Sequence, residues 1–597
     1  MRRTARPLSR HLPTHALAAA VLCALALAGC HRSDAVAEAP ADREVAPKPA
    51  RQTADAAARD EVDKVVVTGS RVARAEERKA AGAVANYQMP AAAPPPPPPM
   101  PAMMIAHEPM PMPDAENTEK YAERDDNPVR RASEEPVSTF SIDVDTGSYS
   151  NVRRMLRGGT RPPADAVRAE EMINYFDYGH PGPSSLATPF RVTTEIAPAP
   201  WNGKRQLLMI GIKGYDVPKA QLPPANLVFL IDTSGSMHSE DKLPLLKQSF
   251  AQLVEQLRPQ DRVTIVVYAG SAGLVLEPTP GSEKAKILAA LDDLQAGGST
   301  NGGAGIQLAY AMAKQAFVKD GVNRVILATD GDFNVGTTDQ KALETLVGDQ
   351  RRHGIALTTL GFGQGNYNDA MAERLADVGD GNHAYIDTLQ EARKVLVQEM
   401  QSTLLTIAKD VKIQIEFNPA QVAEYRLIGY ENRMLKREDF ANDRVDAGDI
   451  GAGHEVTALY EITLVGSGAE RLPALRYAAP ELKGGPVSGE LAHLRLRYKR
   501  PGEETSRLIE TPIAKPHEPR RHAPSASLRF AATVAAYADA LRGGGNIEGW
   551  TWEDIARSAR EAIGNDPWKQ RAEFIGLVDD ARRITGGDTP QIGVIAD

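Results

Sequence analysis

Between residues 226 and 405 the chain alternates between short apolar runs and apolar stripes at helical spacing. Residues 226–231 form one such run, which ends abruptly at Asp232, as a strand buried on both faces does. The helical stripe that follows is stopped by Pro259. Further strands of the same kind are predicted at 263–268, 324–330, 355–360 and 384–386. The pattern predicts a doubly wound α/β domain over residues 223–406.

Alternating or continuous apolar runs flank this domain on both sides, which is typical of antiparallel strands with a buried face. These runs occupy residues 190–196, 206–212, 411–417, 458–464 and 491–498. We expect the strands of residues 116–222 and 407–515 to pack into one β-sandwich, into which the α/β domain is inserted. Two helical stripes predict a C-terminal helical region over residues 516–597.

Small side chains that carry oxygen follow the ends of three predicted elements. Asp232, Ser234 and Ser236 come directly after the first strand of the α/β domain. Thr300 lies in the next glycine-rich loop, and Asp330 ends a later strand. Because open α/β sheets place ligands at the carboxyl edge of their strands, we expect these side chains to meet there. Such a donor set favours Mg²⁺, which takes oxygen ligands and retains water.

The order and spacing of these residues resemble the metal-ion-dependent adhesion site (MIDAS) of von Willebrand factor type A domains, which have a Rossmann-like fold. The match consists of Asp-x-Ser-x-Ser at 232–236, a threonine in the next glycine-rich loop, and Thr-Asp-Gly at 329–331. The resemblance implies that the hydroxyls supply neutral oxygens while the aspartates act directly or through water. It also implies Mg²⁺, with Mn²⁺ or Ca²⁺ as alternatives, and a protein partner whose acidic side chain completes the coordination.

A wider resemblance covers most of residues 117–597. Residues 136–149, 173–178, 328–336 and 426–433, together with the metal-site strand, are similar to bacterial von Willebrand type A lipoproteins of the YfbK family. This resemblance implies the fold and the metal site, and it brings no settled biochemical role.

Other interpretations of the site residues stay open or fail on the sequence. Ser299 could replace Thr300 as the ligand, and Thr300 could instead cap a helix. The run that starts at Asp330 imitates an EF-hand loop. However, Val335 stands where that loop requires glycine and Lys341 where it requires a bidentate acid, which excludes an EF-hand.

An enzymatic alternative rests on three other residues. Asp143 and Asp145 form Asp-x-Asp-Thr after an apolar run, which resembles the paired aspartates of haloacid-dehalogenase-type phosphatases. His238, beside the metal site, could act as the general base of a metal-dependent hydrolase. No later lysine and acidic pair accompanies the two aspartates, and Asp, Thr and Gly are also ordinary turn residues. We therefore expect a protein that is not an enzyme.

The first 29 residues have the form of a lipoprotein signal peptide. A leader with four arginines and no acid precedes the apolar run 16–29, which is too short to span a bilayer. The sequence Leu-Ala-Gly-Cys that ends at Cys30 resembles the lipobox of bacterial lipoproteins, in which the cysteine becomes the lipidated first residue. Cleavage would remove Cys23, the other cysteine, so no internal disulfide is expected. With His31 after the cysteine, the resemblance implies an outer-membrane anchor.

Charge and composition add two further points. Removal of the leader takes the formal charge from −9 to −13, which argues against a nucleic-acid partner. Residues 30–115 are rich in Pro and Ala and cannot form a core, so we expect a disordered tether. Within it, the run from Val65 to Arg71 resembles the segment that opens the plug of TonB-dependent outer-membrane receptors. Such a receptor is a second candidate partner.

The first functional hypothesis is an outer-membrane lipoprotein, facing the periplasm or the exterior, that binds a protein partner through a Mg²⁺-dependent adhesion site. A metal-dependent hydrolase or phosphatase is the second hypothesis. A structural envelope protein that uses the metal only for folding is the third.

Overall fold

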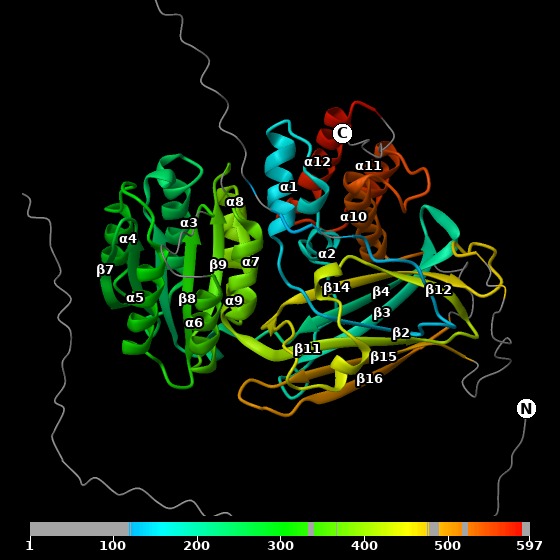
Figure 1. Ribbon diagram of the computed structural model, residues 1–597, viewed down its shortest axis with the longest axis horizontal. Helices are drawn as coiled ribbons and strands as arrows, with labels where there is room; N and C mark the ends of the chain where they lie inside the picture. The colour runs from blue at the N-terminus through cyan, green and yellow to red at the C-terminus, as the bar shows by residue number, and fades with distance from the viewer. Residues whose placement is uncertain are drawn as a thin grey trace, which may run out of the picture. The chain divides into compact units, whose positions relative to one another are not determined.

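The structure is a computed structural model, shown in Figure 1, which describes residues 119, 121–123, 125–331, 340–365, 367–473, 476, 489–515 and 523–587. The predicted signal peptide and tether, with Cys30 and the run from Val65 to Arg71, lie outside the described residues. Most of the EF-hand-like run, residues 332–339, lies outside them as well. Among the described helices, none is long and apolar enough to cross a membrane.

A six-stranded sheet in the order β10-β9-β8-β5-β6-β7 forms the centre of the α/β domain. Its strands are β5 (Ala225–Asp232), β6 (Arg262–Tyr268), β7 (Ala272–Pro280), β8 (Val322–Thr329), β9 (Ala356–Phe362) and β10 (His383–Ile386). The five strands other than β7 are parallel, and β7 pairs with β6 in the antiparallel direction. Every residue of the central strand β5 is buried, which explains its continuous apolar sequence. The predicted doubly wound fold is confirmed.

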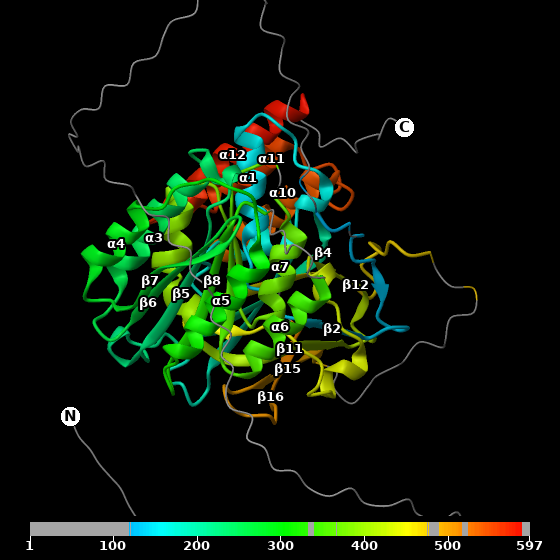
Figure 2. The ribbon, with the colours of Figure 1, turned by 60° about the vertical axis from the view of Figure 1, so that its left-hand side comes forward.

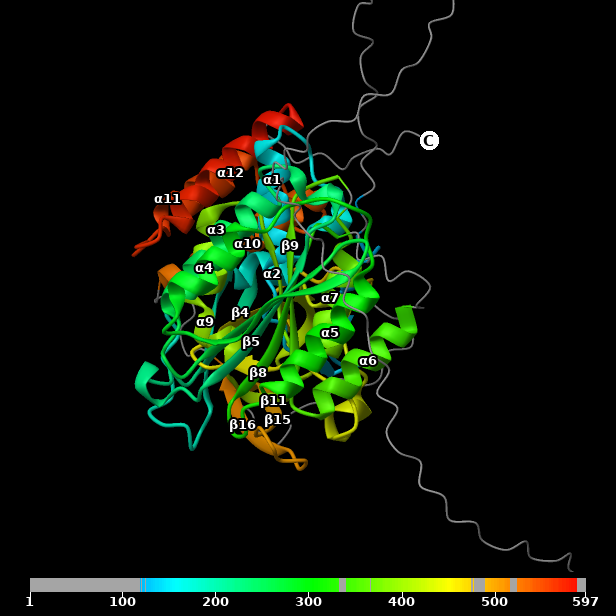
Figure 3. The ribbon, with the colours of Figure 1, turned by 90° about the vertical axis from the view of Figure 1, so that its left-hand side faces the viewer.

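Helices cover both faces of this sheet, as Figures 2 and 3 show. One face carries α3 (Leu243–Gln256), α4 (Lys284–Asp292), α8 (Leu389–Arg393), the π-helical turn η4 (Lys394–Gln398) and α9 (Met400–Leu404). The other face carries α5 (Gly302–Gln315), α6 (Gln340–Arg352) and α7 (Asp369–Val378). Alternate residues of β5 point into the two hydrophobic cores, one on each face of the sheet. Phe229 packs on Phe250 of α3 with ring centroids 4.3 Å apart, whereas Val228 and Leu230 belong to the other core.

The β-sandwich consists of two sheets drawn from both sides of the α/β domain. The first sheet contains β1 (Arg130–Arg131), β12 (Val422–Ile428), β14 (Glu455–Leu464), β4 (Asn202–Gly214) and β3 (Phe190–Ala199), in that order. The second contains β13 (Ile450–Gly451), β11 (Thr406–Phe417), β15 (Glu490–Lys499) and β16 (Arg507–Ala514), with β2 (Val137–Ser141) paired to β11. Because β4 pairs with β14 and β2 with β11, each sheet needs strands from both halves of the chain. The predicted insertion of the α/β domain into a sandwich is confirmed.

The helical region also contains two helices that precede the α/β domain. The sequence pattern did not predict that these two helices pack with the C-terminal ones. Its helices are α1 (Gly147–Arg157), α2 (Ala169–Asn174), α10 (Ala526–Arg542), α11 (Trp552–Glu561) and α12 (Gln570–Thr585). Figure 1 shows α1 and α2 beside α10 and α12. Phe176, just after α2, makes edge contacts with Phe530 and Phe574, at centroid distances of 5.0 and 5.6 Å. Short 3₁₀ turns complete the described secondary structure: η1 (Ala164–Ala166), η2 (Lys219–Gln221), η3 (Gly235–His238), η5 (Glu431–Arg433) and η6 (Arg437–Ala441).

The chain enters and leaves the α/β domain at adjacent points. Leu222 and Ala225 of the incoming segment line one small cavity together with Leu405, which leads into β11. The incoming segment is held by Arg258, whose guanidinium donates to the Leu222 carbonyl at 2.7 Å. Since β5 begins here and ends at Asp232, both connections lie at the opposite edge of the sheet from the candidate site.

A buried arginine joins α1 to the α/β domain and to α12. Arg153 is 1% exposed, and its guanidinium pairs with Asp387 at 2.8 Å, with Glu391 at 2.7 Å and with Glu573 at 3.1 Å. These carboxylates come from the end of the α/β domain and from α12. Loss of this cation would leave Asp387 and Glu391 without their arginine, while Glu573 would keep its pair with Arg157.

Glu170, at the start of α2, is a buried carboxyl whose pKa lies far above its usual range. Burial, together with the neighbouring Glu431, Asp143 and Glu171, raises the pKa from an ordinary 4.5 to about 8. The folded protein therefore takes up a proton at this position over a range in which the unfolded chain is ionised. The free energy of unfolding should fall as the pH rises from 4.5 toward 8.

Replacement of Glu170 with glutamine should remove this dependence, because the amide keeps the shape and carries no charge. We expect Glu170→Gln to raise the free energy of unfolding at pH 7.5, and to flatten its decline between pH 5.5 and 7.5 by on the order of 1 kcal/mol per pH unit. Urea unfolding at the two pH values measures both effects. The exposed Glu504 supplies the control, Glu504→Gln. Equal behaviour of the two variants would contradict the prediction.

Candidate metal centre

Asp232 and Asp330 lie at the carboxyl ends of β5 and β8. Between these two neighbouring strands the order of the chain through the sheet changes direction. From β5 the chain moves to β6 and β7 on one side, and then crosses to β8 on the other side. β5 and β8 are parallel neighbours, with Ile231 opposite Ala328. Asp232 therefore ends one strand and Asp330 follows the other, at the switch point where open α/β sheets bind ligands.

Asp232 is fully buried and its two carboxylate oxygens are held by different partners. Oδ1 accepts the backbone N–H of Ser234 at 2.8 Å, and Oδ2 accepts the hydroxyl of Thr329 at 3.3 Å. Burial and, to a smaller extent, the nearby Asp330 raise the pKa of Asp232 to about 6, against hydrogen bonds from Ser234 that lower it. The carboxylate is thus fixed in orientation, with its charge incompletely compensated by these neutral groups.

The two serines present their hydroxyls to each other at the surface end of the site. Ser234 Oγ and Ser236 Oγ lie 3.0 Å apart. Ser234 is buried, whereas Ser236 is exposed on the 3₁₀ turn η3. The separation equals the edge of an octahedron whose metal–oxygen bonds are about 2.1 Å long, the geometry that Mg²⁺ demands.

The glycine-rich loop is hydrogen-bonded to the Asp-x-Ser-x-Ser turn on both sides. Gly235 donates its N–H to the Gly298 carbonyl at 3.0 Å, and Gly297 donates to the Thr233 carbonyl at 2.8 Å. These bonds bring the loop that carries Thr300 against the turn. The N-cap of α5 is Asn301, whose side chain accepts the N–H of Ala304 at 3.4 Å, so Thr300 does not serve as that cap.

Asp330 is fully buried and faces a lysine. Its Oδ2 accepts from Lys242 Nζ at 2.9 Å, and the lysine side chain is only 10% exposed. Sequence reasoning missed both Lys242 and Thr329. For Lys242 a signal was present, because a lysine that precedes the first turn of α3 stands where the helix dipole disfavours a cation.

The donor set fits a hard divalent cation. It offers carboxylate and hydroxyl oxygens at one edge of the sheet, with no soft ligand among them. The described residues hold no group of three or more His, Cys, Asp or Glu side chains arranged to bind a metal. Asp232 and Asp330 are two carboxylates, so a cation at this edge would also need the neighbouring hydroxyls or water as ligands.

Comparisons with known proteins match three parts of the chain. The family described as von Willebrand factor type A domain matches residues 226–403, the family described as von Willebrand factor matches residues 115–209, and the C-terminal family of Uncharacterized protein YfbK matches residues 402–584. Uncharacterized protein YfbK of Escherichia coli K12 is 51% identical over 475 residues, which cover 78% of this chain and 82% of that protein. The chain belongs to the YfbK family. It is thus a von Willebrand factor type A domain protein, as the sequence predicted.

More distant similarities involve parts of this YfbK-family chain. Human inter-alpha-trypsin inhibitor heavy chain H4 is 30% identical over 163 residues, which cover 26% of this chain and 17% of that one. Among solved structures, a von Willebrand factor type A protein from Catenulispora acidiphila covers 69% of this chain and 99% of its own, with 14% identity and a TM-score of 0.37.

The aspartates of the phosphatase hypothesis are used as counter-ions in the YfbK-family structure. Asp143 and Asp145 are buried and pair with Arg433 at 3.2 and 3.5 Å. Asp145 Oδ1 also accepts the backbone N–H of His383 at 2.8 Å. Arg433 extends the network to Asp377 of α7 at 2.8 Å, which ties the sandwich to the α/β domain. Both carboxylates are thus buried and engaged with the same arginine. His238, the candidate base, is exposed on η3.

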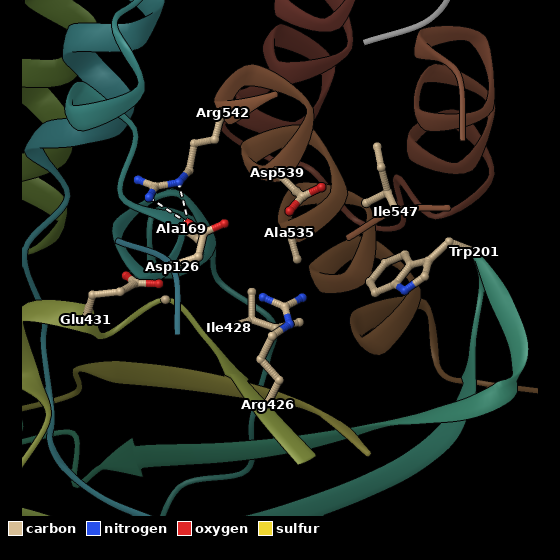
Figure 4. Close-up of a pocket in the computed structure, with 11 residues that line it drawn as sticks. Asp126, Ala169, Trp201, Arg426, Ile428, Glu431, Ala535, Asp539, Arg542 and Ile547 are labelled. Carbon is tan, nitrogen blue, oxygen red and sulfur yellow. Dashed lines mark hydrogen bonds and ion pairs between the residues drawn. The ribbon is translucent and has the colours of Figure 1, made fainter. Parts of the chain in front are cut away.

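The pocket in Figure 4 lies between the sandwich and the helical region, on elements that carry none of the predicted metal ligands. Arg426 rises from β12 toward α10, and Arg542 of α10 pairs with Asp126 at 2.6 Å beside it. The cavity measures about 20 Å³, which is room for about one water molecule. A substrate therefore finds no space here.

Proposed function

We propose that this protein is a lipid-anchored envelope protein that binds a protein partner through Mg²⁺ held by Asp232, Ser234, Ser236, Thr300 and Asp330. An acidic side chain of the partner completes the coordination. Lipid on Cys30 would hold the protein at the outer membrane, and residues 30–115 would let the folded part reach partners away from the lipid.

The observation that carries the proposal is that two buried carboxylates lie next to exposed residues at the same edge of the sheet. Asp232 and Asp330 are fully buried, whereas Ser236 and His238 beside them are exposed. A cation held by these groups faces solvent directly and is bound by few charged ligands. Because neutral hydroxyls leave much of the ion's charge uncompensated, it attracts an external carboxylate. An open rim also suits a macromolecular partner better than an enclosed small substrate.

Capture from envelope extract tests this proposal directly. The tagged full-length protein, incubated with extract in Mg²⁺, should retain a partner that chelation releases and that renewed Mg²⁺ restores. Competition by acetate should weaken capture in Mg²⁺, since acetate presents the same carboxylate chemistry. Capture that persists unchanged in chelator would contradict the proposal. Chelation that unfolds the protein before any partner is lost would favour the structural role of the metal instead.

A further inference from the structure

Lys242 is held beside the metal centre by the fold. Its backbone carbonyl accepts the N–H of Leu246 in the first turn of α3, at 2.8 Å, so its position follows that of the helix. From there the side chain turns inward and reaches the buried Asp330 at 2.9 Å. A cation gains nothing from the start of a helix, so the contact with Asp330 is what favours a lysine here.

The aliphatic part of Lys242 lies in a place that a glycine keeps open. A Cβ at Gly363, directly after β9, would come within 2.3 Å of Lys242 Cε and 2.4 Å of its Cγ. Gly363 also has a φ of +73°, which other residues adopt rarely. Two separate elements thus position the lysine, and its ammonium is directed at one of the two carboxylates of the site.

The charges at this edge have a consequence for the order in which ligands bind. As ionised ligands of a cation, Asp232 and Asp330 bring two negative charges, and Lys242 returns one positive charge. Without the lysine, a divalent cation would leave the centre neutral. With it, the loaded centre keeps a net positive charge, and the Lys242–Asp330 pair lies on its buried side, where charges are screened less than at the surface.

We propose that Lys242 is an internal counter-ion that weakens the binding of the metal alone and strengthens the binding of an acidic ligand to the loaded site. Metal and carboxylate then bind cooperatively, because each reduces the electrostatic cost of the other, and the coupling is reciprocal. The inference rests on the proposed function, since it requires a metal at Asp232 and Asp330. It adds that Lys242 weakens metal binding in the absence of a partner, so that the site binds its metal mainly when an acidic partner is present.

Lys242→Met is the sharpest test, because methionine keeps an unbranched apolar chain beside Gly363 and removes the charge. Titration of the full-length protein with Mn²⁺ or Mg²⁺ in calorimetry should show the variant binding the metal alone about tenfold or more tightly than the wild type. Acetate, with chloride as the matched anion, should tighten metal binding by the wild type and should do so by a smaller factor in the variant. Lys247→Met on the same helix, whose Nζ donates to the Asp292 carbonyl, should behave as the wild type does.

Thermal unfolding supplies a second readout. Without metal, Lys242→Met leaves Asp330 buried without its ammonium, so Tm in chelator should fall. Saturating Mn²⁺ should restore most of the loss, because the divalent ion replaces the missing positive charge. The gap between Tm in Mn²⁺ and Tm in chelator should therefore be wider in the variant than in the wild type.

The outcomes separate this inference from the proposed function. Wild-type protein that binds neither Mg²⁺ nor Mn²⁺ would overturn both. A second outcome would overturn the counter-ion role alone. In it the wild type binds metal, Lys242→Met binds metal equally or more weakly, and the variant loses the same Tm in Mn²⁺ as in chelator. In that case the lysine would be a structural partner of Asp330.

Discussion

Replacing Asp232 with alanine should abolish the stabilisation of this protein by Mg²⁺ and its metal-dependent capture of a partner. Asp232 is the fully buried carboxylate that Ser234 and Thr329 orient toward the hydroxyls of the site. Its removal takes away one of the two negative charges of the site, so metal affinity should fall by roughly 100-fold, about 2.7 kcal/mol. In the wild type, Tm should rise with the concentration of Mg²⁺ above its Kd, and in the variant it should stay nearly constant over the same range of concentrations.

The matched control is Asp292→Ala, which removes an exposed carboxylate at the end of α4 in the same domain. That variant should keep the wild-type response to Mg²⁺ in thermal unfolding and in calorimetry. A Mg²⁺-dependent rise in Tm that survives in Asp232→Ala would show that the metal binds elsewhere, and it would remove the basis of the proposed function.

The second large effect is expected where the helical region meets the α/β domain. Arg153→Met should lower the free energy of unfolding by about 3–5 kcal/mol, because Asp387, Glu391 and Glu573 lose their shared buried cation. Urea unfolding at neutral pH measures this loss. Acidification should reduce the difference between variant and wild type, since protonated carboxyls no longer need a counter-ion.

Arg157 offers a control on the same helix. It also pairs with Glu573, but its side chain is 45% exposed. Arg157→Met should therefore cost less than about 1 kcal/mol, as solvent-exposed ion pairs do. A loss in Arg153→Met no larger than that in Arg157→Met would show that the buried arginine is dispensable for the joint.

Strand ends were predictable from the sequence because a strand that is buried on both faces has an uninterrupted apolar sequence. The run before Asp232 ends where β5 ends, and the one before Asp330 ends where β8 ends, which places both aspartates at one edge. The glycine-rich loop was predictable from its glycines, which allow the close backbone approach that its hydrogen bonds to the Asp-x-Ser-x-Ser turn need. These features depend on local sequence and on a general rule of parallel sheets.

Long-range pairings of charge were not predictable in this way. Lys242 and Asp330 are 88 residues apart, and Arg433 and Asp143 are 290 apart, so no periodicity connects them. The same holds for α1 and α2, whose apolar faces show that they need a partner but do not show which one. As a result Asp143 suggested an enzyme by its spacing, whereas the fold uses it as a counter-ion.

The two connections of the α/β domain lie side by side, at the opposite end of β5 from the site residues. If a partner held at the metal edge pulls against a lipid anchor, the tension runs lengthwise along the central strands and leaves through both connections at once. It then reaches β4 and β11, which are hydrogen-bonded on both sides within their sheets. Strands loaded in this direction resist by shearing many hydrogen bonds together. Under such tension, insertion of the domain through two connections would make its attachment mechanically stronger than a single flexible linker would.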